Sequence, residues 1–189
     1  TRKARLLGRV PGHVAMIEFD RNCRRCPRLA AYLDAGKQQH ADYHCAPVGP
    51  FGSATPRLLI VGLAPGFHGA NATGRPFTGD HAGILLYQTL FDLGWSTAPV
   101  SLNAQDGLEL LGARITNAVK CAPPDNKPTP GEIATCNAYL AAELAARTSV
   151  KAVLALGAIA HSAVLSAVGL PQAQFRFRHG AEYPLPRNR

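Results

Sequence analysis

The chain has 189 residues, of which 47% are hydrophobic and 17% are charged, and this composition excludes a disordered tail and a highly charged coiled coil. Lys and Arg number 20 against 12 Asp and Glu, so the formal charge of +8 favours an anionic partner, most simply nucleic acid. Apolar runs are too short for a membrane span, and the basic N-terminus does not resemble a signal peptide. We therefore expect one cytoplasmic domain over residues 1–189, with no membrane partner.

The first 50 residues lack a regular pattern and are predicted to form an N-terminal clasp, with a short helix around 29–33. A continuous apolar run at 58–61 then predicts a strand that is buried on both faces. Similar runs at 115–119 and 152–156 predict two more strands of the same kind. Such strands are typical of a parallel sheet.

Segments of helical period lie between these strands, at 82–93, 132–147 and 159–168. Thr129, Pro130 and Glu132 predict the start of the second helix, with a capping box. Residues 175–178 alternate apolar and cationic side chains and are a fourth strand candidate. We predict an α/β fold, namely a three-layer α/β/α sandwich around a central, mostly parallel four-stranded sheet, with a site at the strand C-termini.

The cysteines favour metal chemistry over a disulfide framework, because their number, five, is odd. Cys23 and Cys26 form a close pair, and Cys121 and Cys136 form a wider one. Four thiolates from two segments suit a zinc site or an iron–sulfur cluster, and the open second pair favours the cluster. The alternative is four unrelated buried thiols. Cys45 is expected to be a free thiol.

A glycine-rich loop at 62–80 follows the first predicted strand and is the candidate binding site. Glycine lets backbone approach a ligand closely, and the two prolines restrict the loop. The loop lacks both the phosphate-binding Gly-Lys-Ser/Thr ending and the dinucleotide fingerprint. ATP and NAD are therefore poor candidates.

Each polar or aromatic residue of this region also has a structural alternative. Phe77 is a stacking platform or a core residue, and Asp80 is a catalytic carboxylate or a helix N-cap. His68 is a functional donor or a solvated loop residue. Asn117 and Asn126 either bind a base edge or form turns.

The order of motifs along the chain resembles the iron–sulfur uracil-DNA glycosylases, of the family 5 type. The matching segments run from Cys23 to Leu29, Gly62 to Gly66, Thr73 to Asp80 and Ile115 to Pro124, followed by Cys136 and by Phe177 to Leu185. Gly62-Leu63-Ala64-Pro65-Gly66 replaces the acidic first motif of the family 4 enzymes. The resemblance covers residues 20–185.

This resemblance implies a DNA glycosylase that removes uracil, hypoxanthine or modified pyrimidines from DNA. It implies a structural [4Fe-4S] cluster on Cys23, Cys26, Cys121 and Cys136. Because Ala64 stands where related enzymes have a polar residue, positioning of the attacking water falls to Asp80. The family's second motif, a His in a His-x-Ser-type segment, is expected after Leu185 but is absent before Arg189, which puts full activity of these residues in question.

In the mechanism that follows, the target nucleotide is extruded into the pocket. Phe77 stacks on the base, the backbone from Gly62 through Ala64 to Gly66 lines its edge, and Asn117 or Asn126 binds its amide face. His68 is the candidate donor to the departing base. The predicted phosphate contacts, in a chain expected to be a monomer, are Arg75, Lys120, Lys127, Arg176 and Arg178. The rival hypotheses are a non-catalytic iron–sulfur DNA-binding protein and a zinc or redox iron–sulfur protein without a role on DNA.

Overall fold

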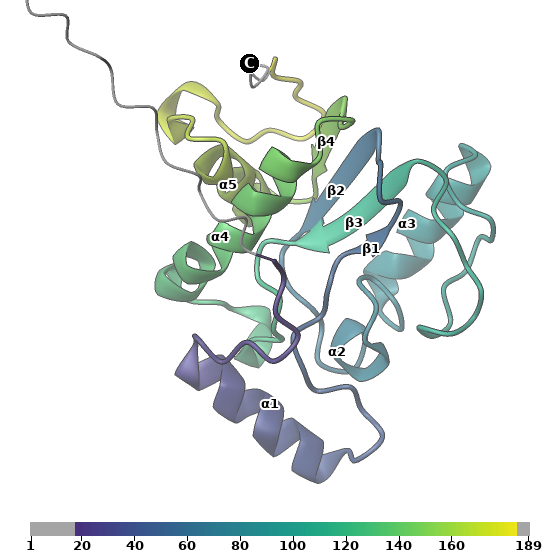
Figure 1. Ribbon diagram of the computed structural model, residues 1–189, viewed down its shortest axis with the longest axis vertical. Helices are drawn as coiled ribbons and strands as arrows, with labels where there is room; N and C mark the ends of the chain where they lie inside the picture. Colours follow the sequence, from purple (N-terminus) through teal and green to yellow (C-terminus); the bar gives the residue numbers. More distant parts are fainter. Residues whose placement is uncertain (1–17, 185–189) are drawn as a thin grey trace, which may run out of the picture.

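The computed structural model describes residues 18–184, which form a four-stranded sheet flanked by helices (Figure 1). The basic N-terminus and Leu185 lie outside the described residues. The strands are β1 (Phe51–Gly52), β2 (Leu58–Gly62), β3 (Ala113–Asn117) and β4 (Ala152–Ala155), in the order β1-β3-β2-β4. The helices are α1 (Pro27–Gln39), α2 (Ala70–Thr73), α3 (His81–Asp92), α4 (Pro130–Ala146) and α5 (Ala158–Ala167). Short 3-10 turns occupy Pro124–Asn126 and Gln172–Gln174.

The predicted three-layer sandwich is confirmed by the packing on the two faces of β2. Leu59 and Val61 pack with side chains of α4 and α5 on one face. Ile60 packs on the other face with Tyr87 and Leu90 of α3. Successive strand residues point to opposite faces, so both sides of β2 are buried and its run is apolar throughout. Figure 1 shows α4 and α5 on one side of the sheet and α3 on the other.

Three predicted strands are present, but β4 is not buried on both faces. Within residues 18–184 it pairs only with β2, in parallel register from Leu58↔Ala152 to Val61↔Ala155, and is therefore an edge strand there. Leu154 remains 44% exposed. An apolar run alone does not distinguish a central strand from an edge strand, because that depends on the order of strands in the sheet.

The fourth strand is not the one predicted from the sequence. Residues 175–178 follow a 3-10 turn and do not join the sheet; Phe175 is hydrogen-bonded through its carbonyl to His161 of α5, 2.6 Å away. β1, which directly follows the expected clasp of residues 1–50, takes the fourth place and pairs antiparallel with β3. Arg114 of β3 stabilises this junction by donating to the carbonyls of Gly52 and Ser53.

The first helix is longer than predicted and begins at Pro27. Proline suits the first turn of a helix, where its missing N–H leaves no bond unmade. Leu29, Ala30 and Leu33 are buried, but the last turn presents a glycine: a Cβ on Gly36 would lie 2.8 Å from the ring of Phe67. The helix therefore continues where its apolar periodicity has ended, because it packs against the glycine-rich loop.

The capping box predicted for α4 is present. The Thr129 hydroxyl accepts from the Glu132 N–H, and the Glu132 carboxylate accepts from the Thr129 N–H at 2.7 Å. Glu132 also binds Arg28 of α1 at 2.7 and 2.9 Å, which ties the two helices together. Within residues 18–184, no helix has the length and apolar character needed to cross a membrane.

Candidate active site and cysteine pocket

A pocket of about 450 Å³ opens where the segments that follow β2 and β3 meet the first helix. The glycine-rich loop contributes one wall, the turn at Pro124–Asn126 another, and Tyr32 of α1 a third. Parallel strands end at the same edge of a sheet, which explains why segments far apart in sequence converge there. The lining residues are Tyr32, Gly66, Phe67, His68, Gly69, Gly79, Asp80, Pro123, Asp125 and Asn126.

Four of the predicted site residues line this pocket together: Gly66, His68, Asp80 and Asn126. A Cβ on Gly66 would meet nothing within 4 Å, so open space adjoins the backbone there. Asn126 is exposed, and its φ of 55° is the turn geometry that sequence reasoning offered as its alternative. Asp125, which was not predicted, also lines the pocket and has a φ of 54°.

Asp80 is both the N-cap of α3 and a pocket residue, so its two sequence interpretations are compatible. Its Oδ1 accepts from the N–H of Gly83 at 2.8 Å, which satisfies one of the unpaired donors of the first turn. Its Oδ2 accepts no hydrogen bond from the described part of the chain. The cap therefore fixes the orientation of the carboxylate and leaves one oxygen for another partner.

Two glycines that the sequence analysis did not single out make this arrangement possible. A Cβ on Gly83 would lie 1.9 Å from the carbonyl oxygen of Phe77, and a Cβ on Gly69 would lie 2.7 Å from the Cβ of Asp80. Phe77 itself has a φ of 55°. The sequence offered one signal for these two residues, because Gly69 and Gly83 lie on either side of the predicted Asp80.

Phe77 and Asn117 both lie close to Gly62, and none of these three residues lines the pocket. A Cβ on Gly62 would lie 2.5 Å from both the Asn117 Oδ1 and the Phe77 ring. Phe77 is half-buried and packs against the core that contains Ile60 and Tyr87, while Asn117 is only 2% exposed. The Asn117 Oδ1 is buried without a hydrogen-bond partner in the described residues, which is unusual because such an orphan raises the free energy of the fold. Ala64 lies elsewhere, beside the cysteine cluster.

Arg75 is not available for DNA phosphate, contrary to the sequence prediction. It is 5% exposed, its Nη1 lies 2.7 Å from the Asp106 Oδ1, and its guanidinium lies 4.3 Å from the centre of the Phe51 ring. Burial raises the pKa of Asp106, but bonds from the Leu108 N–H and from Arg75, together with two further backbone N–H groups, lower it to about 2. Arg75 therefore stabilises the loop from within, through its contacts with Asp106 and Phe51.

Lys120 was also predicted to contact phosphate, and that prediction is wrong as well. The residue is 1% exposed, and its Nζ donates to the Thr116 hydroxyl and, at 2.9 Å, to the Asn117 carbonyl. Burial lowers the pKa of this amine, and the nearby Glu143 carboxylate opposes that effect. A cation that directly follows an apolar strand is easily mistaken for a surface charge when only its sequence neighbours are known. Lys127 and Arg178, in contrast, are exposed.

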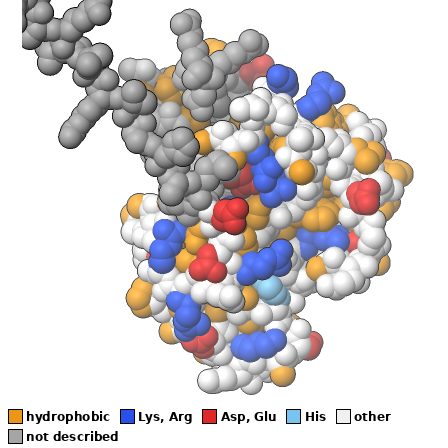
Figure 2. Space-filling model, viewed as in Figure 1, with side chains coloured by type: hydrophobic (Ala, Val, Ile, Leu, Met, Phe, Trp, Pro, Cys, Tyr) orange, Lys and Arg blue, Asp and Glu red, His pale blue; other side chains and the backbone are white. Residues whose placement is uncertain are grey.

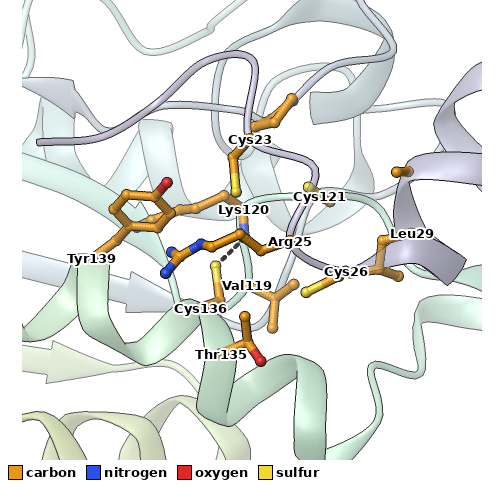
Figure 3. Close-up of a pocket in the computed structure, with 12 residues that line it drawn as sticks. Cys23, Arg25, Cys26, Leu29, Val119, Lys120, Cys121, Thr135, Cys136 and Tyr139 are labelled. Carbon is orange, nitrogen blue, oxygen red and sulfur yellow. Dashed lines mark hydrogen bonds between the residues drawn. The ribbon is translucent and has the colours of Figure 1, made fainter. Parts of the chain in front are cut away.

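The four predicted ligand cysteines line one small pocket between the start of α1, the segment after β3 and the first turns of α4 (Figure 3). Cys136 accepts a hydrogen bond from the N–H of Lys120 at 3.3 Å. Burial, together with the neighbouring Cys136, Cys23 and Cys26, raises the pKa of Cys121 to about 12. The interpretation as unrelated buried thiols does not fit this convergence.

The thiols are close without forming a closed coordination site. Within residues 18–184, no group of three or more His, Cys, Asp or Glu side chains has the spacing of a bound metal ion. The Arg25 guanidinium, whose Cζ lies 4.5 Å from the centre of the Tyr139 ring, occupies the space beside Cys23 and Cys136 (Figure 3). Cys45 stands apart from this pocket and accepts a bond from the Asn71 Nδ2 at 3.4 Å.

The surface charge is spread over the molecule. Figure 2 shows Lys and Arg side chains distributed across the viewed face, with Asp and Glu side chains between them. Several arginines are held in ion pairs with carboxylates, such as Arg28 with Glu132 and Arg114 with Glu143. The net charge of +8 is therefore not concentrated in one band on this face.

The structure defines an α/β protein with a glycine-rich loop and a carboxylate at the C-terminal edge of its sheet. The chain belongs to the uracil DNA glycosylase superfamily, whose family model matches residues 50–186.

Within this superfamily, the chain is similar to three type-5 uracil-DNA glycosylases. The chain is 46% identical over 172 residues to a type-5 uracil-DNA glycosylase of Thermus thermophilus, covering 88% of this chain and 78% of the relative. It is 45% identical to type-5 enzymes of Pyrobaculum aerophilum, over 84% of this chain and 71% of that one, and of Mycobacterium tuberculosis, over 84% and 62%.

Proposed function

We propose that this protein is a uracil-DNA glycosylase that hydrolyses the bond between uracil and deoxyribose in DNA. The observation that supports the proposal is a pocket lined both by Asp80 and His68 of the glycine-rich loop and by Asn126. Membership of the uracil DNA glycosylase superfamily supports the same activity. Excision of uracil starts base excision repair, so an intracellular location is part of the proposal.

The base enters this pocket only after it leaves the duplex. Extrusion requires unstacking, at a cost of a few kcal/mol that is smallest for mismatched or damaged bases. The pocket of about 450 Å³ has the size of a small-molecule site and is lined by aromatic rings and a few polar groups. Hypoxanthine and modified pyrimidines are proposed as further substrates.

Binding of the base divides between two groups of residues. The exposed Asn126 amide meets the base from the pocket wall, and the open side of Gly66 admits it next to the backbone. Phe77 and the amide oxygen of Asn117, which is unpaired within residues 18–184, lie beside Gly62, so their contact with the base requires a shift of the loop. Phe77 then supplies stacking and Asn117 a hydrogen bond.

Asp80 holds the water that attacks the sugar. The bond from C1′ to the base breaks first, and the electron pair leaves with the base. The cationic sugar is stabilised by the Asp80 carboxylate, whose free Oδ2 accepts a proton as the water oxygen bonds to C1′. His68, at the same pocket, donates to the negative charge on the departing base.

The four clustered cysteines fit a [4Fe-4S] cluster, which we propose as the resident cofactor. Thiolates are the ligands that such clusters require, and two segments contribute two each. The Arg28–Glu132 ion pair joins α1, whose N-cap is Cys26, to α4, which contains Cys136. When bound, the cluster acts as a structural link. Arg25 would turn away from the space it occupies beside Cys23 and Cys136.

Cys136→Ser is expected to lose the cluster, because a serine hydroxyl is a poor replacement for a buried thiolate ligand. Iron analysis of anaerobically purified protein should give about four iron atoms per wild-type chain, and the variant should have a strongly reduced content and weaker visible absorbance. Cys45→Ser is the matched control, because that thiol lies outside the pocket. An equal iron content in both variants would contradict the ligand assignment.

Contacts to the DNA backbone are proposed for Lys127 and Arg178, both of which are exposed. Lys127 directly follows the pocket turn, so a phosphate next to the extruded nucleotide is within its reach. Electrostatic contacts of this kind position DNA without reading its sequence. We propose that the protein acts on DNA as a monomer.

The activity is tested with the protein in excess over a labelled duplex that contains one uracil. We expect alkali-sensitive cleavage at the uracil position and none in the matched duplex with thymine. Replacing uracil by hypoxanthine in the same assay tests the broader substrate range. Binding of the uracil duplex without cleavage would contradict the glycosylase and identify a non-catalytic lesion-binding protein.

A further inference from the structure

An aromatic cluster joins the end of α1 to the glycine-rich loop at the pocket. Tyr43 stacks on His40 with ring centres 4.4 Å apart and planes inclined by 16°. Phe67 lies within 6.0 Å of Tyr32, His40, Tyr43 and His68, measured between ring centres. Tyr43 does not line the pocket, whereas His68 does.

One hydrogen bond connects Tyr43 to the candidate donor. The Tyr43 hydroxyl lies 2.9 Å from the Nδ1 of His68. A phenol is a good donor, and the neutral imidazole offers one acceptor nitrogen and one N–H. If the hydroxyl donates to Nδ1, the ring proton resides on Nε2, and His68 then has an N–H donor on the side opposite to Tyr43.

The backbone holds Tyr43 firmly enough to orient another side chain. Its N–H donates to the His40 carbonyl at 3.1 Å, and its carbonyl accepts from Lys37. The next residues are bonded to the loop itself, His44 N–H to the Ala72 carbonyl at 3.0 Å and Cys45 N–H to the Asn71 carbonyl at 3.1 Å. Movement of Tyr43 relative to the loop would break these bonds.

We propose that Tyr43 is a positioning residue that keeps His68 in the Nε2–H form and presents this donor to the negative charge on the departing base. His68 is exposed and its loop is rich in glycine, so the ring has no other hydrogen-bond partner in the described residues to fix it. Preorganised donors stabilise developing charge better than mobile ones. This inference rests on the proposed glycosylase activity.

Nitrogen NMR of histidine-labelled protein tests the pairing independently of activity. At a pH where His68 is neutral, the wild-type ring should show the Nε2–H pattern, with the His68 signals assigned by their absence in His68→Gln. Tyr43→Phe keeps the ring stack but removes the hydroxyl, so we expect a mixture of both ring forms. An unchanged Nε2–H pattern in Tyr43→Phe would overturn the proposal.

A double-mutant cycle tests the catalytic part. Tyr43→Phe should lower the single-turnover excision rate by roughly three- to tenfold, the loss of one hydrogen bond. In the His68→Gln background the same change should have almost no effect, because Tyr43 acts through His68. Equal effects in both backgrounds would show a merely structural role and overturn the inference. Tyr183→Phe, which removes a hydroxyl bonded to the Arg176 carbonyl, is the matched control.

The two experiments separate this inference from the proposed function. Wild-type protein that fails to release uracil would contradict the glycosylase, and with it the catalytic part of the inference. The ring form of His68 would still decide whether Tyr43 sets its orientation, because the NMR measurement needs no substrate.

Discussion

Asp80→Asn is expected to lower the single-turnover rate of uracil release by roughly 10²- to 10⁴-fold, the range typical of losing a general base. The asparagine retains an oxygen that can accept from the Gly83 N–H, and it is as good an N-cap as aspartate. The start of α3 and the pocket should therefore keep their geometry. What the variant loses is the negative charge and basicity of the oxygen that faces the water. The measurement is the excision rate with protein in excess over substrate.

Two further variants make this result interpretable. Asp92→Asn makes the same change of charge at the exposed end of the same helix and should leave the rate unchanged. Asp80→Ala removes both the charge and the cap, so it should also lower the free energy of unfolding by about 1 kcal/mol. A wild-type rate in Asp80→Asn would remove this carboxylate from the mechanism and point to Asp125, the other acid of the pocket.

Arg75→Met is expected to lower the free energy of unfolding by about 3–5 kcal/mol. Removing the guanidinium strands the Asp106 carboxylate in a buried position, where only neutral donors remain. It also removes the cation from the Phe51 ring. Because the arginine lies in the glycine-rich loop, the damage should extend to the pocket. Urea unfolding of the wild-type and variant proteins gives the difference.

A second substitution distinguishes the stranded charge from lost packing. Asp106→Asn in the Arg75→Met background removes the unpaired charge, so the double variant should be more stable than Arg75→Met alone. Arg24→Met breaks an ion pair with Asp34 whose side chains are more than half exposed, and it should leave the urea midpoint almost unchanged. Equal effects of Arg75→Met and Arg24→Met would contradict the assigned role of Arg75.

The same ion pair gives the stability a defined pH dependence. The folded-state pKa of Asp106 is about 2, below the ordinary value of 3.8. A lowered carboxyl pKa contributes stability that is fully present above about pH 4 and is lost as the pH falls toward 2. Unfolding measured at pH 7 and pH 3 should therefore show a smaller acid sensitivity in Asp106→Asn than in the wild-type protein.

Much of the architecture was predictable because it depends on local patterns. The apolar runs at β2 and β3, the periodic segments of α3, α4 and α5, and the cap at Thr129 each reflect a preference of neighbouring residues. The pairing of β1 with β3 and the edge position of β4 were not predictable in this way. They depend on contacts between segments that are distant in sequence.

By itself, the sequence determined which chemical groups are present and in which order: the four cysteines, the glycine-rich loop and the carboxylate that ends it. Only the tertiary structure decided which of those groups face the pocket. Arg75 and Lys120 carry the positive charge that a phosphate ligand needs. The loop and the sheet, however, enclose them among carboxylate, hydroxyl and carbonyl partners. Tyr43 belongs to no sequence motif, and only the fold places its hydroxyl next to His68. Burial and pairing arise when distant segments pack together, so the environment of a charged or polar side chain is a property of the fold.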